Sequence, residues 1–176
     1  MNDRNHKKCI TLIGMPAAGK STVGVVLAKR AGMRFIDVDL VIQEKTGKLL
    51  KDLIAEHGDE GFRRIEEQVN AELQAENAVI APGGSVVYGP KAMAHLKELG
   101  PVVYLKLGYY AVRSRLGNLK DRGVSIKKGQ TLKDLYNERV KLYEKYADIV
   151  IDEKGLNTRK VAEAIMKAVF EDESGE

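Results

Sequence analysis

The segment Gly14–Ser21, Gly-Met-Pro-Ala-Ala-Gly-Lys-Ser, constrains the fold of this chain more than any other part of its sequence. It matches the phosphate-binding pattern G-x-x-x-x-G-K-[ST] at every fixed position. A short apolar run, Cys9–Gly14, leads into it, and a segment with helical spacing, Lys20–Ala31, follows it. A strand, a glycine-rich loop and a helix in this order predict a loop that binds the phosphates of a nucleotide.

The residue types in this loop suit phosphate chemistry. Successive backbone N–H groups and the start of the following helix attract an anion. We expect Lys20 to bring its positive charge to the β- and γ-phosphates, Ser21 to coordinate Mg²⁺, and Thr22 to donate to another phosphate oxygen. The predicted nucleotide-binding residues of the loop are Gly14, Ala17, Ala18, Gly19, Lys20, Ser21 and Thr22.

The rest of the chain alternates short apolar runs with segments of helical period, which predicts an α/β fold of three layers (α/β/α) around a five-stranded parallel sheet. Besides Cys9–Gly14, the predicted strands are Arg34–Asp39, Ala78–Gly84, Val102–Leu107 and Asp148–Asp152. Besides Lys20–Ala31, the predicted helical segments are Leu40–Glu76 (broken near Gly47 and Gly58), Pro90–Leu99, Tyr109–Leu116, Leu132–Tyr146 and Thr158–Phe170.

Length and composition indicate one domain of 176 residues, with its core over about 8–170 and a disordered acidic tail over 171–176. The polar, basic stretch 117–130 is interpreted as a mobile lid. The net charge of +4 comes from scattered residues, so a nucleic-acid partner is not indicated. Apolar runs are too short to cross a membrane, and no signal-peptide pattern is present. With Cys9 as the single cysteine, we expect a buried inert thiol in a cytoplasmic monomer.

Ligands of parallel sheets bind beyond the carboxyl ends of the strands, so the residues there are the candidates for chemistry. Asp37 and Asp39 end the second predicted strand, where alternation along an extended chain places both carboxylates on one side. They suit a magnesium-bound phosphate and a hydroxyl that must lose a proton. The alternative for Asp39 is a helix cap. Gly83 and Gly84 end the third strand, where backbone N–H groups can bind a substrate oxygen, unless the glycines only make a turn.

Arginines are the candidates for binding an anionic substrate. Arg63 and Arg64 are neighbours in a helical segment and point about 100° apart, so at most one faces the site. Arg115, Lys120 and Arg122 surround the predicted lid, and Arg139 lies in the helix after it. A cation on a closing loop can neutralise charge on a transferring phosphate. Each of these residues could equally lie on a solvated surface.

Taken together, GMPAAGKST, FIDVD, FRRIE, the glycine turn and NERVKLYEKYAD resemble the shikimate kinase family, from about Ile10 to Asp152. The resemblance implies transfer of the γ-phosphoryl of ATP to the 3-hydroxyl of shikimate with Mg²⁺. It implies that Lys20, Asp39 and Arg122 are catalytic, and that Ser21 and Asp37 lie at the metal. It adds Arg115 and Arg122 to the ATP-binding residues. The implied substrate-binding residues are Asp39, Arg63, Gly83, Gly84 and Arg139, which suits a small carboxylate with hydroxyls.

The sequence departs from the family pattern at two places near the expected substrate. Ser85 stands where the family usually has a third glycine, and Gly-Val-Ser-Ile follows Arg122 in place of Pro-Leu-Leu. A relative that phosphorylates another small hydroxy metabolite, such as homoserine, therefore stays open.

Two other function classes also stay open. A nucleotide-driven switch would need no acceptor; a GTPase normally carries N-K-x-D, and Asn118-Leu-Lys-Asp121 has the wrong spacing. A nucleoside or nucleotide kinase usually needs a longer chain for its lid and base pocket.

Overall fold

The computed structural model describes residues 8–117 and 126–171, and its centre is a parallel sheet. The order of its strands is β2-β3-β1-β4-β5, and every pairing is parallel. The strands are β1 (Ile10–Ile13), β2 (Arg34–Asp37), β3 (Ala78–Ala81), β4 (Val102–Lys106) and β5 (Ile149–Asp152). This confirms the predicted five-stranded parallel sheet.

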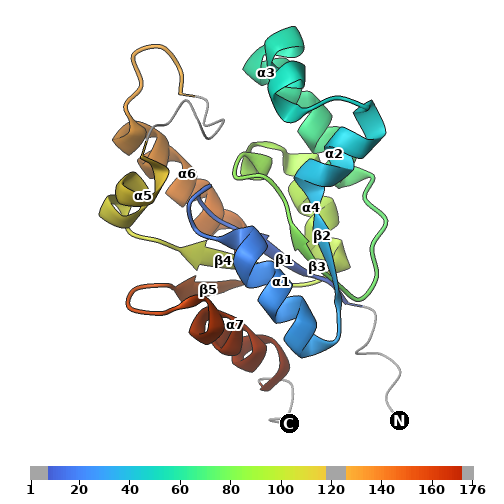
Figure 1. Ribbon diagram of the computed structural model, residues 1–176, viewed down its shortest axis with the longest axis vertical. Helices are drawn as coiled ribbons and strands as arrows, with labels where there is room; N and C mark the ends of the chain where they lie inside the picture. Colours follow the sequence, from blue (N-terminus) through green and yellow to red (C-terminus); the bar gives the residue numbers. More distant parts are fainter. Residues whose placement is uncertain (1–7, 118–125, 172–176) are drawn as a thin grey trace.

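Helices cover both faces of the sheet. α1 and α7 pack side by side against one face, whereas α4 and α6 lie against the other, as Figure 1 shows. The helices are α1 (Lys20–Ala31), α2 (Val38–Thr46), α3 (Leu50–Ala71), α4 (Pro90–Leu99), α5 (Tyr109–Leu116), α6 (Leu132–Tyr146) and α7 (Thr158–Met166). The three-layer α/β/α prediction is therefore confirmed, and four helices have the bounds that the sequence predicts.

The predicted second strand is too long. β2 ends at Asp37, which caps α2: its side chain accepts a hydrogen bond of 3.0 Å from the backbone N–H of Asp39. Asp39 therefore lies in the first turn of a helix, and the argument from strand alternation was wrong. The predicted cap was also assigned to the wrong aspartate. A capping carboxylate satisfies an otherwise free N–H group, which favours starting the helix at Val38 over extending the strand.

Two further elements differ from the predictions. A short 3₁₀ helix, η1 (Val86–Tyr88), follows the glycine turn. The last helix ends at Met166 and continues as a π-helical segment, η3 (Lys167–Glu171). Cys9 is a buried free thiol, as expected. Among the described residues, no helix is long and apolar enough to cross a membrane.

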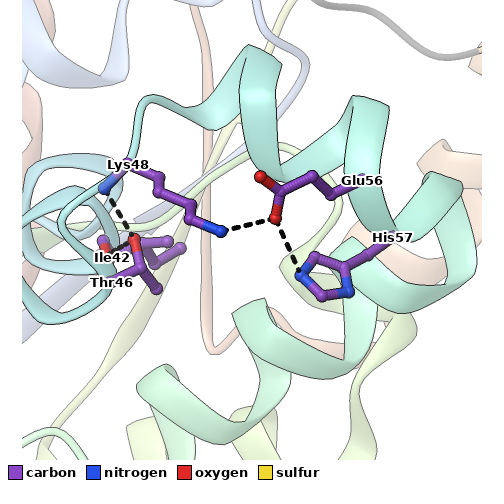
Figure 2. Close-up of polar contacts among 5 residues, drawn as sticks. All are labelled: Ile42, Thr46, Lys48, Glu56 and His57. Carbon is purple, nitrogen blue, oxygen red and sulfur yellow. Dashed lines mark hydrogen bonds and ion pairs between the residues drawn. The ribbon is translucent and has the colours of Figure 1, made fainter.

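The breaks predicted near Gly47 and Gly58 are present. Gly47 ends α2, and Gly58 bends α3 with φ 68° and ψ 179°. Between them, Lys48 donates a hydrogen bond of 2.6 Å to Glu56, and Glu56 also lies 3.7 Å from His57 (Figure 2). These surface contacts join the end of α2 to the first half of α3, which forms one wall of the cavity described below.

Candidate active site

The side chain of Lys20, the first residue of α1, turns back toward the loop between β1 and α1. Nζ of Lys20 donates to the carbonyls of Gly14 at 2.9 Å and Met15 at 3.0 Å. The side chain is only 8% exposed. Burial, followed by the positive charge of Arg139, lowers the pKa of Lys20 to about 8. A buried ammonium among backbone dipoles at the carboxyl end of β1 is suited to a phosphate, which offers it a stronger partner than a carbonyl does.

Ser21 and Asp37 meet beside this lysine. The hydroxyl of Ser21 donates to Oδ2 of Asp37 at 3.3 Å, while Oδ1 of the same carboxylate caps α2. Oxygen donors of this kind are what Mg²⁺ binds in proteins, where it keeps several waters and uses one or two protein ligands with the substrate phosphates. Within 8–117 and 126–171, no cluster of three metal-ligating side chains is present. The oxygen atoms of Ser21 and Asp37 are of the type that would suit a magnesium ion bound together with nucleotide phosphates.

Next to the loop lies a cavity of about 200 Å³, between α2, α3, α6 and the turn after β3. Two charged residues predicted from the sequence, Asp39 and Arg139, line it together with the predicted Gly83 and Gly84. The remaining lining residues are Pro16, Leu50, Lys51, Ile54, Phe62, Glu66 and Ser85. On the α3 side the cavity thus has three apolar side chains together with the charged Lys51 and Glu66, and Asp39 and Arg139 face it from α2 and α6.

The two glycines allow close approach of the charged groups. A Cβ atom on Gly83 would lie 2.4 Å from Oε1 of Glu66 and 3.4 Å from Oδ1 of Asp39. A Cβ on Gly84 would lie 3.2 Å from Nη1 of Arg139 and 3.2 Å from Pro16. Any side chain at Gly83 would displace Glu66. The turn therefore brings its backbone to the floor of the cavity, as the strand-end argument predicts.

Asp39 is a candidate proton acceptor. Burial, followed by the charge of Asp37, raises the pKa of Asp39, and Lys20 opposes the shift. A raised pKa makes a carboxylate a better base near neutral pH. From the first turn of α2, where its own backbone N–H is capped by Asp37, Asp39 faces the glycine turn even though the strand argument for it failed.

The predicted arginines lie in different surroundings. Arg139 is 4% exposed; burial opposes its charge, but Tyr143 and Tyr88 outweigh this and raise the pKa. Arg63 is half-buried with its guanidinium carbon 4.1 Å from the centre of the Tyr88 ring, whereas Arg64 is exposed. Arg115 lies on the other side of the loop, where Nη1 donates to the carbonyl of Ala17 at 3.1 Å. Arg122 and Lys120 lie outside the described residues.

Three residues of the site were missed by the sequence reasoning. Glu66 is 2% exposed and accepts a hydrogen bond of 2.5 Å from Ser85; burial raises its pKa to about 7. It lies three residues after Arg63, so helical spacing could have indicated it. The buried Tyr143 donates to the carbonyl of Gly84 at 2.6 Å, one turn after Arg139.

The third missed residue, Glu153, directly follows β5, and the strand-end rule applied to that strand would have selected it. It is 6% exposed, and burial raises its pKa to about 7 against the charges of Arg115 and Lys20. Within the described part of the chain, its Oε2 has no hydrogen-bond partner. A buried carboxylate therefore lies on the Arg115 side of the loop, opposite the cavity.

Comparison with known proteins places this chain in a family. The shikimate kinase family model matches residues 16–170. The chain is 37% identical to a shikimate kinase of Aromatoleum aromaticum, over 91% of this chain and 93% of that protein. A shikimate kinase of Acinetobacter baumannii solved in complex with shikimate superposes with a TM-score of 0.85 at 31% identity, covering 94% of each chain. The prediction from the sequence motifs is thus confirmed: this chain belongs to the shikimate kinase family.

Proposed function

We propose that this protein transfers the γ-phosphoryl group of ATP to the 3-hydroxyl of shikimate, assisted by Mg²⁺. The observation that carries the proposal is the cavity beside the phosphate-binding loop, where Asp39 and Arg139 face a space of about 200 Å³. A carboxylate acceptor with several hydroxyls needs both a cation and a hydrogen-bond acceptor at short range. The shikimate held by the Acinetobacter baumannii relative supports this choice of acceptor.

On the nucleotide side, the phosphates bind to the loop Gly14–Thr22 and Lys20 exchanges its two carbonyl partners for phosphate oxygens. Ser21 and Asp37 would hold Mg²⁺, which supplies positive charge to the phosphates. Arg115 lies against the outer side of the loop and contacts the nucleotide there. Arg122, which lies outside the described residues, is included in the proposal as a residue that binds the phosphates.

On the acceptor side, Arg139 and Arg63 bind the carboxylate, and the turn at Gly83 and Gly84 contacts the ring hydroxyls. Asp39 accepts the proton of the attacking hydroxyl as its oxygen bonds to the γ-phosphorus and the bond to the β,γ-bridging oxygen breaks. Lys20 and Arg122 stabilise the charge on the transferring group. Positioning and electrostatics supply most of the rate in such transfers.

Ser85 does not introduce a new free donor into the cavity, because its hydroxyl is bonded to Glu66. The departure from three glycines is therefore compatible with shikimate as the acceptor. We also propose that the protein is a single-domain monomer that acts in the cytoplasm. Measuring its molecular mass in solution tests whether it is a monomer.

The test is an acceptor panel followed by a pair of adjacent arginine variants. Purified protein is assayed for ADP formation with shikimate, homoserine, gluconate and nucleosides, and we expect turnover with shikimate alone. Arg63→Ala should then raise KM for shikimate at least tenfold with KM for ATP within about twofold. The exposed neighbour Arg64→Ala is the matched control and should change neither. Turnover of homoserine but not shikimate, or equal effects of Arg63→Ala on both KM values, would overturn the proposal.

A further inference from the structure

We infer that Tyr88 is a positioning residue that holds the two carboxylate-binding arginines in place; the inference rests on the proposed function. Tyr88 is the last residue of η1, the 3₁₀ helix that follows the glycine turn. This short helix packs against α3, α4 and α6. Arg63 comes from α3 and Arg139 from α6, so the short helix that carries Tyr88 packs against both helices that carry the arginines.

Both guanidinium groups approach the same ring. The guanidinium carbon of Arg63 lies 4.1 Å from the ring centre of Tyr88, and that of Arg139 lies 5.6 Å from it. Two positive groups this close repel each other, and the repulsion is strongest before an anionic substrate arrives. An aromatic ring attracts cations through its quadrupole without carrying a charge that would compete for them. The ring thus allows both arginines to stay together, and Nε of Arg139, which has no hydrogen-bond partner among the described residues, is left for a carboxylate.

The ring is itself fixed by its hydroxyl. Tyr88 donates a hydrogen bond of 2.5 Å to Oε1 of Glu138, the residue directly before Arg139 on α6. Oε2 of the same carboxylate accepts a hydrogen bond of 3.3 Å from Gln130, at the end of the segment 126–130. Burial, and then the hydrogen bond to Glu138, raise the pKa of Tyr88, so the phenol keeps the proton that it donates. The tyrosine therefore ties α6 to the turn at one end and orients arginines at the other.

Pre-organised arginines matter for affinity because a flexible guanidinium loses side-chain freedom when it binds. The geometry predicts a selective defect. Removing the ring should weaken binding of the carboxylate, whereas removing only the hydroxyl should have a smaller effect because the ring still contacts both cations. Neither change alters the phosphate-binding loop or the side chains of Ser21 and Asp37.

The kinetic test compares Tyr88→Leu and Tyr88→Phe with Tyr146→Leu. Tyr146 is a matched control because it is another half-buried tyrosine that contacts a cation, with Lys145 5.1 Å from its ring centre, at the far end of α6. We expect Tyr88→Leu to raise KM for shikimate about tenfold, and Tyr88→Phe about two- to threefold, with KM for ATP unchanged. Tyr146→Leu should leave both KM values unchanged. A Tyr88→Leu enzyme with unchanged KM for shikimate, or with both KM values raised equally, would overturn the inference.

A second measurement separates positioning from a general loss of structure. The methyl ester of shikimate lacks the negative charge, so its kcat/KM should fall no more than about twofold in Tyr88→Leu, while kcat/KM for shikimate falls about tenfold. If kcat/KM falls by the same factor for shikimate and for its methyl ester, the ring of Tyr88 has only a structural role.

A third measurement needs no substrate and so remains informative if the proposed acceptor is wrong. In the ligand-free protein, the Nε–H resonance of Arg63 should be shifted by the ring of Tyr88 in the wild type and in Tyr88→Phe, and should lose that shift in Tyr88→Leu. If the shift is present but shikimate is not phosphorylated, the proposed function fails and the positioning contact stands. If shikimate is phosphorylated and the shift is absent, the positioning role fails alone.

Discussion

Ser85 donates a hydrogen bond of 2.5 Å to Oε2 of Glu66, and this bond joins the turn after β3 to the middle of α3. Glu66 is 2% exposed, so its carboxylate depends on the few donors within reach. The residue that departs from the family's three glycines is therefore a partner of the buried acid beside the cavity. The hydrogen bond between Ser85 and Glu66 therefore affects the free energy of ionising the Glu66 carboxyl group.

Replacing Ser85 by alanine should destabilise the protein more at high pH than at low pH. The serine hydroxyl lowers the pKa of Glu66 against the larger effect of burial, so its loss makes the ionised form costlier. We expect a loss of about 1–2 kcal/mol in the free energy of unfolding at pH 8 and a smaller one at pH 5, measured by urea denaturation. The exposed Ser114→Ala is the control. An equal loss at the two pH values would contradict the assigned partnership.

Glu66→Gln should become progressively more stable than the wild type as the pH rises. The folded-state pKa of Glu66, about 7, lies above its usual value of 4.5. The stability that this group contributes is therefore complete below pH 4.5 and is lost as the pH rises through about 7. The difference in unfolding free energy between Glu66→Gln and wild type should change by about 3 kcal/mol over this window. Denaturation from pH 4.5 to 8, with Glu72→Gln as control, measures it; a flat difference counts against the burial argument.

The pH dependence of catalysis should show the deprotonation of Lys20 in the ligand-free enzyme. Its pKa of about 8 belongs to the ligand-free protein, where burial disfavours the charge. Phosphates bound beside it raise that pKa again, so kcat/KM for ATP should fall above pH 8 while kcat persists to higher pH. Steady-state rates between pH 6.5 and 10 at saturating shikimate test this. Lys20→Ala should lose turnover throughout, and a parallel decline of kcat and kcat/KM in the wild type would refute the assignment.

Asp37→Asn should weaken the response to Mg²⁺ while preserving the fold. Asparagine caps a helix about as well as aspartate does, so α2 should keep its first turn. The loss of a charged oxygen should raise the Mg²⁺ concentration for half-maximal activity at least tenfold. Asp37→Ala removes the cap as well and should also lose about 1 kcal/mol of stability. If Asp37→Asn titrates with Mg²⁺ as the wild type does, the metal role is wrong.

The fold was predictable because its periodic segments end at clear signals. α4 begins at Pro90 and α1 ends before Gly32, as the sequence indicates. β2 shows where local patterns fail: an apolar run passes through Val38, but a side-chain cap from Asp37 ends the strand earlier. Apolar spacing carries no information about such a hydrogen bond.

Local sequence patterns could point to candidate site residues only where a single chain segment holds them. The loop Gly14–Thr22 is contiguous, and the end of β3 indicated Gly83, whereas Asp39 was selected by a strand argument that the position of α2 contradicts. Tyr88 and Ser85 act through partners 50 and 19 residues away, which no local pattern encodes. Arg122 stays a prediction, since it lies outside the described residues.

α6 contacts several parts of the site that the structure describes. Along its length Tyr136 donates to the carbonyl of Leu107, Glu138 accepts from Tyr88 and Gln130, and Tyr143 donates to Gly84. A shift of α6 would therefore disturb its contacts with Met15 in the phosphate-binding loop, with the turn at Gly84 and with Gln130 at the same time. Variants along α6 must accordingly be judged by the Michaelis constants of both substrates, because location on the helix does not tell which of the two a side chain serves.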